Sequence, residues 1–214
     1  MHWLLDIKNV VIEIKGYPIS YIEAFSVLTA LVSVWLAAKN NIHTWTVGIV
    51  SVIAFFFLFY QVQLYSDMLL QAFFLVTSAL GILWWNKAQS TLNKLSKDHM
   101  ILVWLLVLFF SWALGMFMKD IHTILPLYFT LPAEYPFSDA FTTVGSIVAT
   151  ILLIRRTLQT WILWLSIDAV AIVVYYQRDL YVVSAEYLVF ACMALYGLYR
   201  WNKEFKFIGA LEHG

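Results

Sequence analysis

The sequence predicts an all-α integral membrane protein with seven transmembrane helices in a three plus one plus three arrangement of parallel repeats. Composition is the first observation behind this prediction, because 63% of the 214 residues are apolar and only 12% are charged, unlike an ordinary soluble domain. The second is residues 100–118, which carry no charge and are long enough to cross a hydrocarbon core of about 30 Å. The third is an internal repeat.

Apolar runs predict the helices and leave a segment at each end of the chain. Residues 1–18 mix charged and apolar side chains at near-helical spacing, end at Gly16 and Pro18, and lack the features of a cleaved signal peptide. We expect this segment to lie at the membrane interface and residues 203–214 to form a cytoplasmic tail. The helices are expected at residues 19–38, 44–63, 67–86, 99–118, 137–154, 160–177 and 181–201.

A shift of 116 residues places the chain on itself without a gap. The repeat predicts two three-helix units, residues 19–86 and 137–202, joined by a linker, residues 87–136, that contains the fourth transmembrane helix. Because this extra crossing gives both units the same orientation, a substrate site is expected where the repeats meet near the bilayer midplane. The matches include residues that rarely coincide in an apolar chain: Trp45 with Trp161, Gly81 with Gly197, and Trp85-Asn86 with Trp201-Asn202.

The distribution of positive charge predicts the orientation of the chain. Nine Lys and Arg residues follow the first, third, fifth and seventh predicted helices, whereas four lie on the opposite side. The excess places the N-terminus outside and the C-terminus in the cytoplasm. The formal net charge is zero, which argues against a nucleic-acid partner and leaves membrane lipid as the expected surroundings.

The stretch WILWLSID, residues 161–168, carries an aspartate in the middle of a predicted transmembrane helix. Trp161, Trp164 and Asp168 are spaced three and four residues apart, so they share one helix face, which we call the Trp–Asp face. An acid at the bilayer centre costs about 2.5 to 3.5 kcal/mol and therefore requires a partner, a bound group or water. Indoles beside a carboxylate favour a flat cationic ring. Two alternatives stay open: Trp161 belongs to an interfacial aromatic belt, and Asp168 makes a structural contact.

Other polar side chains within the predicted helices are candidates for substrate binding. Buried polar groups require hydrogen-bond partners, and a substrate can supply them. Each of the two asparagines among them follows a tryptophan at the inner end of its predicted helix, so a helix C-terminal cap explains them equally well. The repeat also places one pair, Gln71 and Tyr187, at equivalent positions. The candidates are Gln71, Asn86, Glu186, Tyr187 and Asn202.

The sequence gives no sign of an enzyme, a metal site or a cofactor. The five histidines lie in the termini or near predicted helix ends, and no catalytic or phosphate-loop motif occurs. A seven-helix receptor is the alternative from a different class. However, residues 181–199 contain no lysine for a retinal Schiff base, and a repeated three-helix unit fits a receptor poorly.

Three motifs make the chain resemble the PnuC family of bacterial nicotinamide riboside transporters over essentially its whole length: the Trp–Asp face, QVQLYSDMLLQ at 61–71 and YGLYRWN at 196–202. The resemblance implies a SWEET-like fold in the inner membrane and facilitated diffusion of an unphosphorylated vitamin, which a cytoplasmic nicotinamide riboside kinase then traps. Nicotinamide riboside, a flat pyridinium cation with a carboxamide and ribose hydroxyls, suits the candidate residues. The lack of an evident Arg or Lys cluster at the midplane disfavours a phosphorylated substrate.

Several alternatives stay open at this point. Thiamine or riboflavin could replace nicotinamide riboside as the vitamin, since the motifs are typical of the wider group of Pnu vitamin transporters. Transport could be passive or coupled to protons. The oligomeric state, with a homo-oligomer as one alternative, is not indicated by the sequence.

Overall fold

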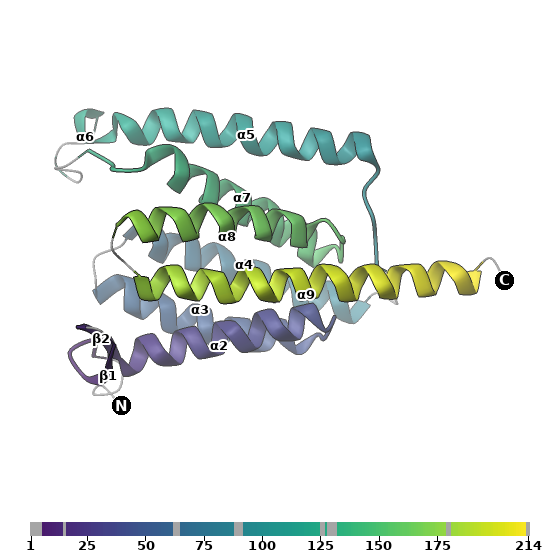
Figure 1. The fold of residues 1–214 in the computed structure, drawn as a ribbon, viewed down its shortest axis with the longest axis horizontal. Coiled ribbons are helices and arrows are strands. Elements are labelled where there is room, and N and C mark those ends of the chain that lie inside the picture. The colour runs from purple at the N-terminus through teal and green to yellow at the C-terminus, as the bar shows by residue number, and fades with distance from the viewer. Residues whose placement is uncertain are drawn as a thin grey trace. The chain divides into compact units, whose positions relative to one another are not determined.

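The computed structural model describes residues 6–14, 16–61, 65–87, 92–124, 127, 132–178 and 181–212. Residues 1–5 of the expected N-terminal segment and 62–64 of the motif at 61–71 lie outside the described part. Six helices are long and apolar enough to cross a membrane, which confirms a helical multi-pass membrane protein. They are α2 (Tyr21–Ala38), α3 (His43–Gln61), α5 (Lys97–Lys119), α7 (Pro136–Ile154), α8 (Thr160–Gln177) and α9 (Tyr181–Glu212) (Figure 1).

The chain divides into two compact units. The first comprises residues 1–91 together with 199–214, and the second comprises residues 92–198. Helix α9 is one continuous helix that contributes to both units. Its residues 181–198 belong to the second unit, and its remainder belongs to the first. The predicted end of this helix at residue 201 is wrong, because α9 continues to Glu212. Hydropathy falls where a helix leaves the bilayer, whereas a helix ends only where its backbone hydrogen bonding stops.

The first unit begins with a β-hairpin of β1 (Val10–Ile14) and β2 (Tyr17–Ser20). The near-helical spacing within residues 1–18 did not predict these strands. The apolar residues of β1 are all β-branched, and such residues favour strands. The turn contains Gly16, whose φ of 84° lies in the left-handed region that glycine adopts without a steric penalty. The hairpin leads directly into α2 (Figure 1).

Helices α2, α3 and α4 (Tyr65–Lys87) of the first unit pack one against the next. A capping box starts α2: the Ser20 hydroxyl accepts a hydrogen bond from the Glu23 backbone N–H, and the Glu23 carboxylate accepts one from the Ser20 backbone N–H. The Tyr17 hydroxyl also donates to Glu23, at 2.8 Å. These bonds fix the entry of the chain into the first membrane-spanning helix.

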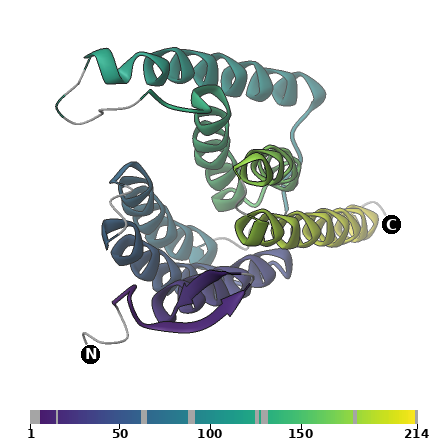
Figure 2. The same cartoon turned by 60° about the vertical axis from the view of Figure 1, so that its left-hand side comes forward.

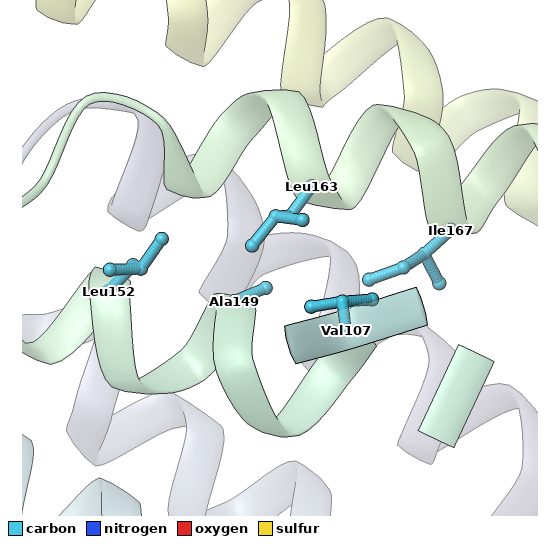
Figure 3. Close-up of a cluster of buried hydrophobic side chains, with 5 residues drawn as sticks. All are labelled: Val107, Ala149, Leu152, Leu163 and Ile167. Atoms are coloured by element: carbon cyan, nitrogen blue, oxygen red, sulfur yellow. The ribbon is translucent and has the colours of Figure 1, made fainter. Parts of the chain in front are cut away.

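The second unit is built around α7, which packs against both α5 and α8 (Figure 2). The short helix α6 (Ile121–Ile124) follows α5. Side chains from three helices meet in one apolar core, and Trp164 packs at its edge. This core positions α8, which carries the Trp–Asp face. Its buried members are Val107, Ala149, Leu152, Leu163 and Ile167 (Figure 3).

Local structure recurs at the offset of the sequence repeat. After α2 and after α7, a residue with left-handed φ breaks the helix: Asn40 at 54° and Arg156 at 51°. The backbone N–H of the following residue then bonds back to the helix, from Asn41 to the Leu36 carbonyl and from Thr157 to the Leu152 carbonyl. Each pair of positions is separated by 116 residues. The two helix-to-helix turns therefore have the same conformation.

Candidate functional site

Trp161 is buried within the second unit, with 1% of its surface exposed. Its ring lies against Gly197 of α9, where an added Cβ would be 2.6 Å from the Trp161 Cε2 atom. No side chain larger than hydrogen fits at that position without movement of the ring. The indole thus packs α8 against α9. This burial disfavours the alternative that Trp161 belongs to an interfacial aromatic belt, because side chains of such a belt lie exposed at the headgroups.

The first unit repeats this packing. Trp45 is buried, and an added Cβ at Gly81 of α4 would clash with its ring. The Trp45 ring also meets Trp85 edge to face, with 5.4 Å between ring centroids. Because both tryptophans of the repeat lie on a glycine of the third helix, helix packing accounts for their burial. Substrate contact by Trp161 stays a prediction.

Asp168 lies in the middle of α8 and is only 3% exposed. Within the described part of the chain, no hydrogen bond or ion pair holds its carboxylate. The open alternative of a structural contact therefore finds no support among these residues. A buried carboxylate is costly in an apolar interior, so this position requires a proton, water or a bound cationic group.

Two sets of contacts join α8 to α9 on either side of Asp168. Toward the start of α8, Trp161 lies on Gly197. Toward its end, the Ser184 hydroxyl donates to the Ile172 carbonyl at 2.9 Å. One turn beyond Ile172, the rings of Tyr175 and Tyr187 stack with 5.3 Å between centroids. The stretch of α8 that carries Asp168 is thus held against α9 at both ends.

The structure places five of the eight predicted site residues in the second unit. Trp161, Trp164 and Asp168 come from α8, and Glu186 and Tyr187 come from adjacent positions of α9. Trp164 turns partly toward the apolar core rather than lying with Trp161. The three-residue step rotates Trp164 by about 60° from Trp161, so the two indoles of the Trp–Asp face have different neighbours.

The three other candidates belong to the first unit. Gln71 is buried in α4, whereas Asn86 is exposed at the last turn of that helix. Asn202 lies inside α9, well before its end at Glu212, so it is not a helix C-terminal cap. Sequence reasoning missed Tyr175 and Ser184. The position of Tyr175, seven residues after Asp168 and on the same helix face, was the available signal.

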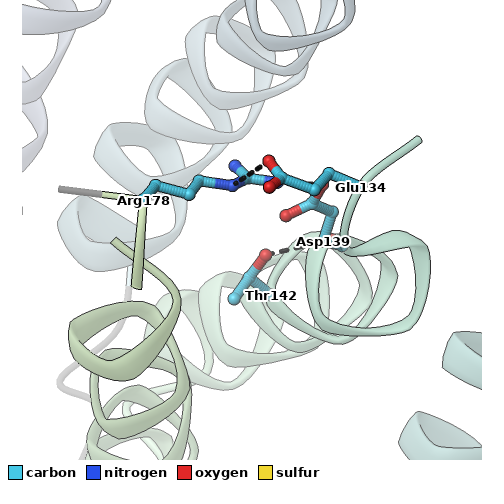
Figure 4. A network of polar contacts seen from close by, with 4 residues as sticks. All are labelled: Glu134, Asp139, Thr142 and Arg178. Carbon is cyan, nitrogen blue, oxygen red and sulfur yellow. Dashed lines mark hydrogen bonds and ion pairs between the residues drawn. The ribbon is translucent and has the colours of Figure 1, made fainter. Parts of the chain in front are cut away.

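A separate polar cluster joins the end of α8 to the start of α7 (Figure 4). Arg178 places its Nε atom 3.4 Å from Glu134 Oε2 and its Nη2 atom 3.4 Å from Asp139 Oδ2. Its guanidinium carbon lies 4.7 Å from the ring centroid of Tyr135. The Thr142 hydroxyl donates to the Asp139 carbonyl at 3.0 Å. These contacts fix two helix ends and lie away from Asp168 along the chain.

Six helices long and apolar enough to span a membrane, one of them with a buried carboxylate, are typical of a multi-pass membrane transporter. The chain belongs to the nicotinamide mononucleotide transporter family, whose model matches residues 20–203. This finding confirms the family membership that the three sequence motifs predicted.

The chain is similar to relatives named as nicotinamide riboside transporter PnuC. It is 28% identical to the Escherichia coli protein over 221 residues, which cover 92% of each chain. It is 25% identical to the Neisseria mucosa protein over 216 residues, which cover 94% of this chain and 80% of the relative. The crystal structure of the vitamin B3 transporter PnuC matches with a TM-score of 0.64 and 22% identity, covering 87% of this chain and 82% of that one. This similarity supports the fold.

Proposed function

We propose that this protein carries nicotinamide riboside across the bacterial inner membrane. Asp168 is the observation that carries the proposal, since it is buried and no hydrogen bond or ion pair holds it within the described residues. A pyridinium ring would supply a cationic partner for this carboxylate, and neighbouring aromatic side chains would favour a flat cation. The names of the relatives in Escherichia coli and Neisseria mucosa support the same substrate.

A nucleoside suits the surroundings of Asp168 better than a nucleotide. No Lys or Arg occurs in residues 157–177 or 179–199, which include the α8 and α9 segments around this carboxylate. A phosphate group would bring about 1.5 to 2 negative charges near Asp168 and Glu186 without a cation to neutralise them. We therefore favour the riboside over the mononucleotide of the family description.

The proposed contacts divide by chemistry. Trp164, Asp168, Glu186 and Tyr187 would bind the cationic ring and the ribose hydroxyls, because they combine aromatic faces with acceptor oxygens. Trp161 would act mainly by packing α8 on α9. Gln71, Asn86 and Asn202 would donate or accept hydrogen bonds to the carboxamide or the ribose, and each is to be tested by its own substitution.

We further propose a membrane topology of seven spans, with α4 as the span that adds to the six already identified. Its apolar part, Leu70–Asn86, is shorter than the others. Two three-helix repeats in the same orientation, with α5 as the linking helix, would give the SWEET-like arrangement. The equivalent turns after α2 and α7 support the repeats, and the excess of positive charge supports a cytoplasmic C-terminus.

The hairpin would lie at the outer membrane surface. It exposes apolar side chains from both faces of β1, and it ends at the residue that caps the first spanning helix. Such side chains partition into the boundary between headgroups and acyl chains. This would give the interfacial segment expected from the sequence, as strands rather than a helix.

Transport would proceed by facilitated diffusion with alternating access, and phosphorylation by a cytoplasmic kinase would retain the product. The test is uptake of labelled nicotinamide riboside into liposomes that contain the purified protein. We expect saturable uptake that nicotinamide mononucleotide, thiamine and riboflavin inhibit poorly, and that dissipating a proton gradient does not change. Preferred uptake of another vitamin would overturn the substrate, and binding without uptake would indicate the receptor class.

The liposome assay has a matched pair of variants on α8. Asp168→Asn removes the buried charge, and we expect it to reduce uptake at low substrate concentration by about tenfold or more. Ser166→Ala is the control, because the Ser166 hydroxyl donates to the Ile162 carbonyl of its own helix at 2.9 Å. Equal uptake by both variants would contradict the role of Asp168.

A further inference from the structure

The stacked pair of Tyr175 and Tyr187 joins α8 to α9 close to the proposed substrate site. The two rings are nearly parallel, with 13° between their planes and 5.3 Å between their centroids, which is an offset-stacked geometry. On another side, Tyr187 meets Phe190 with 6.1 Å between centroids and 66° between planes. The ring of Tyr187 is therefore confined by an aromatic neighbour on each helix.

A hydrogen bond next to this stack fixes the register of the two helices. The Ser184 hydroxyl donates to the Ile172 carbonyl at 2.9 Å. Ser184 lies three residues before Tyr187, and Ile172 lies three residues before Tyr175. A slip of α9 along α8 would break this bond and the stack together. The position of the Tyr187 ring is thus set by the α8–α9 contact as well as by its own rotamer.

Tyr175 also shares the helix face of Asp168, since the two residues are seven positions apart. Tyr187, on which Tyr175 stacks, belongs to the part of α9 that is held against the same stretch of α8. Tyr175 therefore holds a ring of α9 against the α8 face that carries the buried acid. Its sequence neighbour Tyr176 has different surroundings: it is 63% exposed and makes an edge contact with Tyr181.

We propose that Tyr175 is a positioning residue for substrate recognition, which acts by holding the Tyr187 ring in the orientation that binds the substrate beside Asp168. The inference rests on the proposed function and adds a residue to it. A side chain that is already ordered loses less conformational entropy when a ligand binds, so confinement of Tyr187 raises affinity without a contact between Tyr175 and the substrate.

The experiment measures nicotinamide riboside binding by calorimetry with the full-length protein in detergent. Tyr175→Leu removes the stack, and we expect the dissociation constant to rise by about fivefold or more. Tyr175→Phe keeps the stacked ring and loses only the hydroxyl, so the rise in its dissociation constant is expected to stay clearly below that of Tyr175→Leu. Tyr176→Leu is the matched control, since it makes the same substitution one residue away on the exposed side.

A double-mutant cycle separates positioning from a general effect on the fold. If Tyr175 acts through Tyr187, Tyr175→Leu will weaken binding in the unmodified protein but cause no further loss in a Tyr187→Ala background. All variants are compared by their elution as a single species on size exclusion. The maximal uptake rate in liposomes at saturating substrate is expected to stay within about twofold, because the substitution acts on affinity.

The outcomes are distinct. Normal binding by Tyr175→Leu, equal losses in Tyr175→Leu and Tyr175→Phe, or additive losses in the cycle would overturn the positioning role while leaving the proposed function intact. Absence of binding by the unmodified protein would instead remove the proposed function and the inference that rests on it.

Discussion

Thr44 and Thr160, which are 116 residues apart, make the same hydrogen bond to the preceding helix. The Thr44 hydroxyl donates to the Ser33 carbonyl at 2.8 Å, and the Thr160 hydroxyl donates to the Ala149 carbonyl at 2.7 Å. Both threonines are buried, Thr44 at the start of α3 and Thr160 at the start of α8. A buried hydroxyl with a carbonyl partner fixes how closely the two helices approach. The same hydrogen bond therefore stabilises the turn between α2 and α3 and the turn between α7 and α8.

Removing this hydroxyl should have unequal effects in the two units. Thr160→Val is expected to destabilise the protein by about 1 kcal/mol, because it leaves the Ala149 carbonyl without this donor. Thr44→Val should cost less, since the Ser33 hydroxyl still donates to the Thr44 carbonyl at 2.8 Å. Thermal unfolding in detergent, followed by tryptophan fluorescence, checks the order. Thr29→Val is the control, because the two hydrogen bonds of the Thr29 hydroxyl among the described residues both stay within α2; a larger loss there would contradict the argument.

Gly197 should not tolerate a methyl group. A Cβ at this position would lie 2.6 Å from the Trp161 ring, so Gly197→Ala must move α9 or the indole, and overpacking of this kind costs about 1 to 3 kcal/mol. We expect a clearly lower unfolding temperature and loss of uptake. Gly48→Ala is the comparison, and a smaller loss is expected there, since its nearest neighbour is the Ser33 Oγ atom at 3.2 Å, which would have to move by only a few tenths of an ångström.

A second substitution tests whether Trp161 causes the effect of Gly197→Ala. Trp161→Leu in the Gly197→Ala background removes the ring that the methyl group would meet, so we expect it to recover part of the lost unfolding temperature. If the double variant is less stable than both single variants, the close approach of ring and glycine is not the reason for the loss.

The sequence predicted the spanning helices because they depend on local composition, and it singled out Asp168, whose role stays a prediction, because a lone acid in an apolar helix stands out. It did not predict the packing of Trp161 on Gly197, since that contact joins residues far apart along the chain. It also failed to single out Tyr175. Tyr175 and Tyr176 are adjacent and chemically identical, and only the position of α9 decides that one is stacked and the other exposed.

The charge of Asp168, rather than its shape, should control substrate affinity. Asp168→Asn keeps the volume and can still form hydrogen bonds, so a loss of about tenfold or more in riboside affinity would report the missing charge. Asp168→Glu should recover part of it. Calorimetry in detergent measures both, with Ser166→Ala as the control on the same helix. Unchanged affinity in Asp168→Asn would show that hydrogen bonding is sufficient.

Trp164 should contribute to affinity through its aromatic face. Trp164→Phe keeps a ring and is expected to weaken riboside binding only about two- to threefold, whereas Trp164→Leu should weaken it about tenfold. Because Trp164 also packs at the edge of the apolar core, unfolding temperature is measured alongside binding. Equal affinity of the Phe and Leu variants would assign Trp164 to packing alone.

Arg178 should stabilise the contact between the end of α8 and the start of α7. We expect its ion pair with Asp139 to contribute more to this stability than its ion pair with Glu134. The Asp139 side chain is 50% exposed and that of Glu134 is 68% exposed, so water screens the second pair more strongly. Asp139 also lies in the first turn of α7, where a carboxylate is favoured. We therefore expect Asp139→Asn to lower the unfolding temperature more than Glu134→Gln, with each loss below about 1 kcal/mol.

Arg178→Lys separates charge from geometry at the same cluster. Lysine keeps the positive charge but cannot reach two carboxylates with a planar fork or lie flat over the Tyr135 ring. Thermal unfolding at low and high salt distinguishes the two contributions, because salt screens the partly exposed ion pairs far more than ring contact. We expect Arg178→Lys to lose stability at both salt concentrations. A loss that disappears at high salt would mean that the ion pairs act alone and that the Tyr135 contact adds nothing.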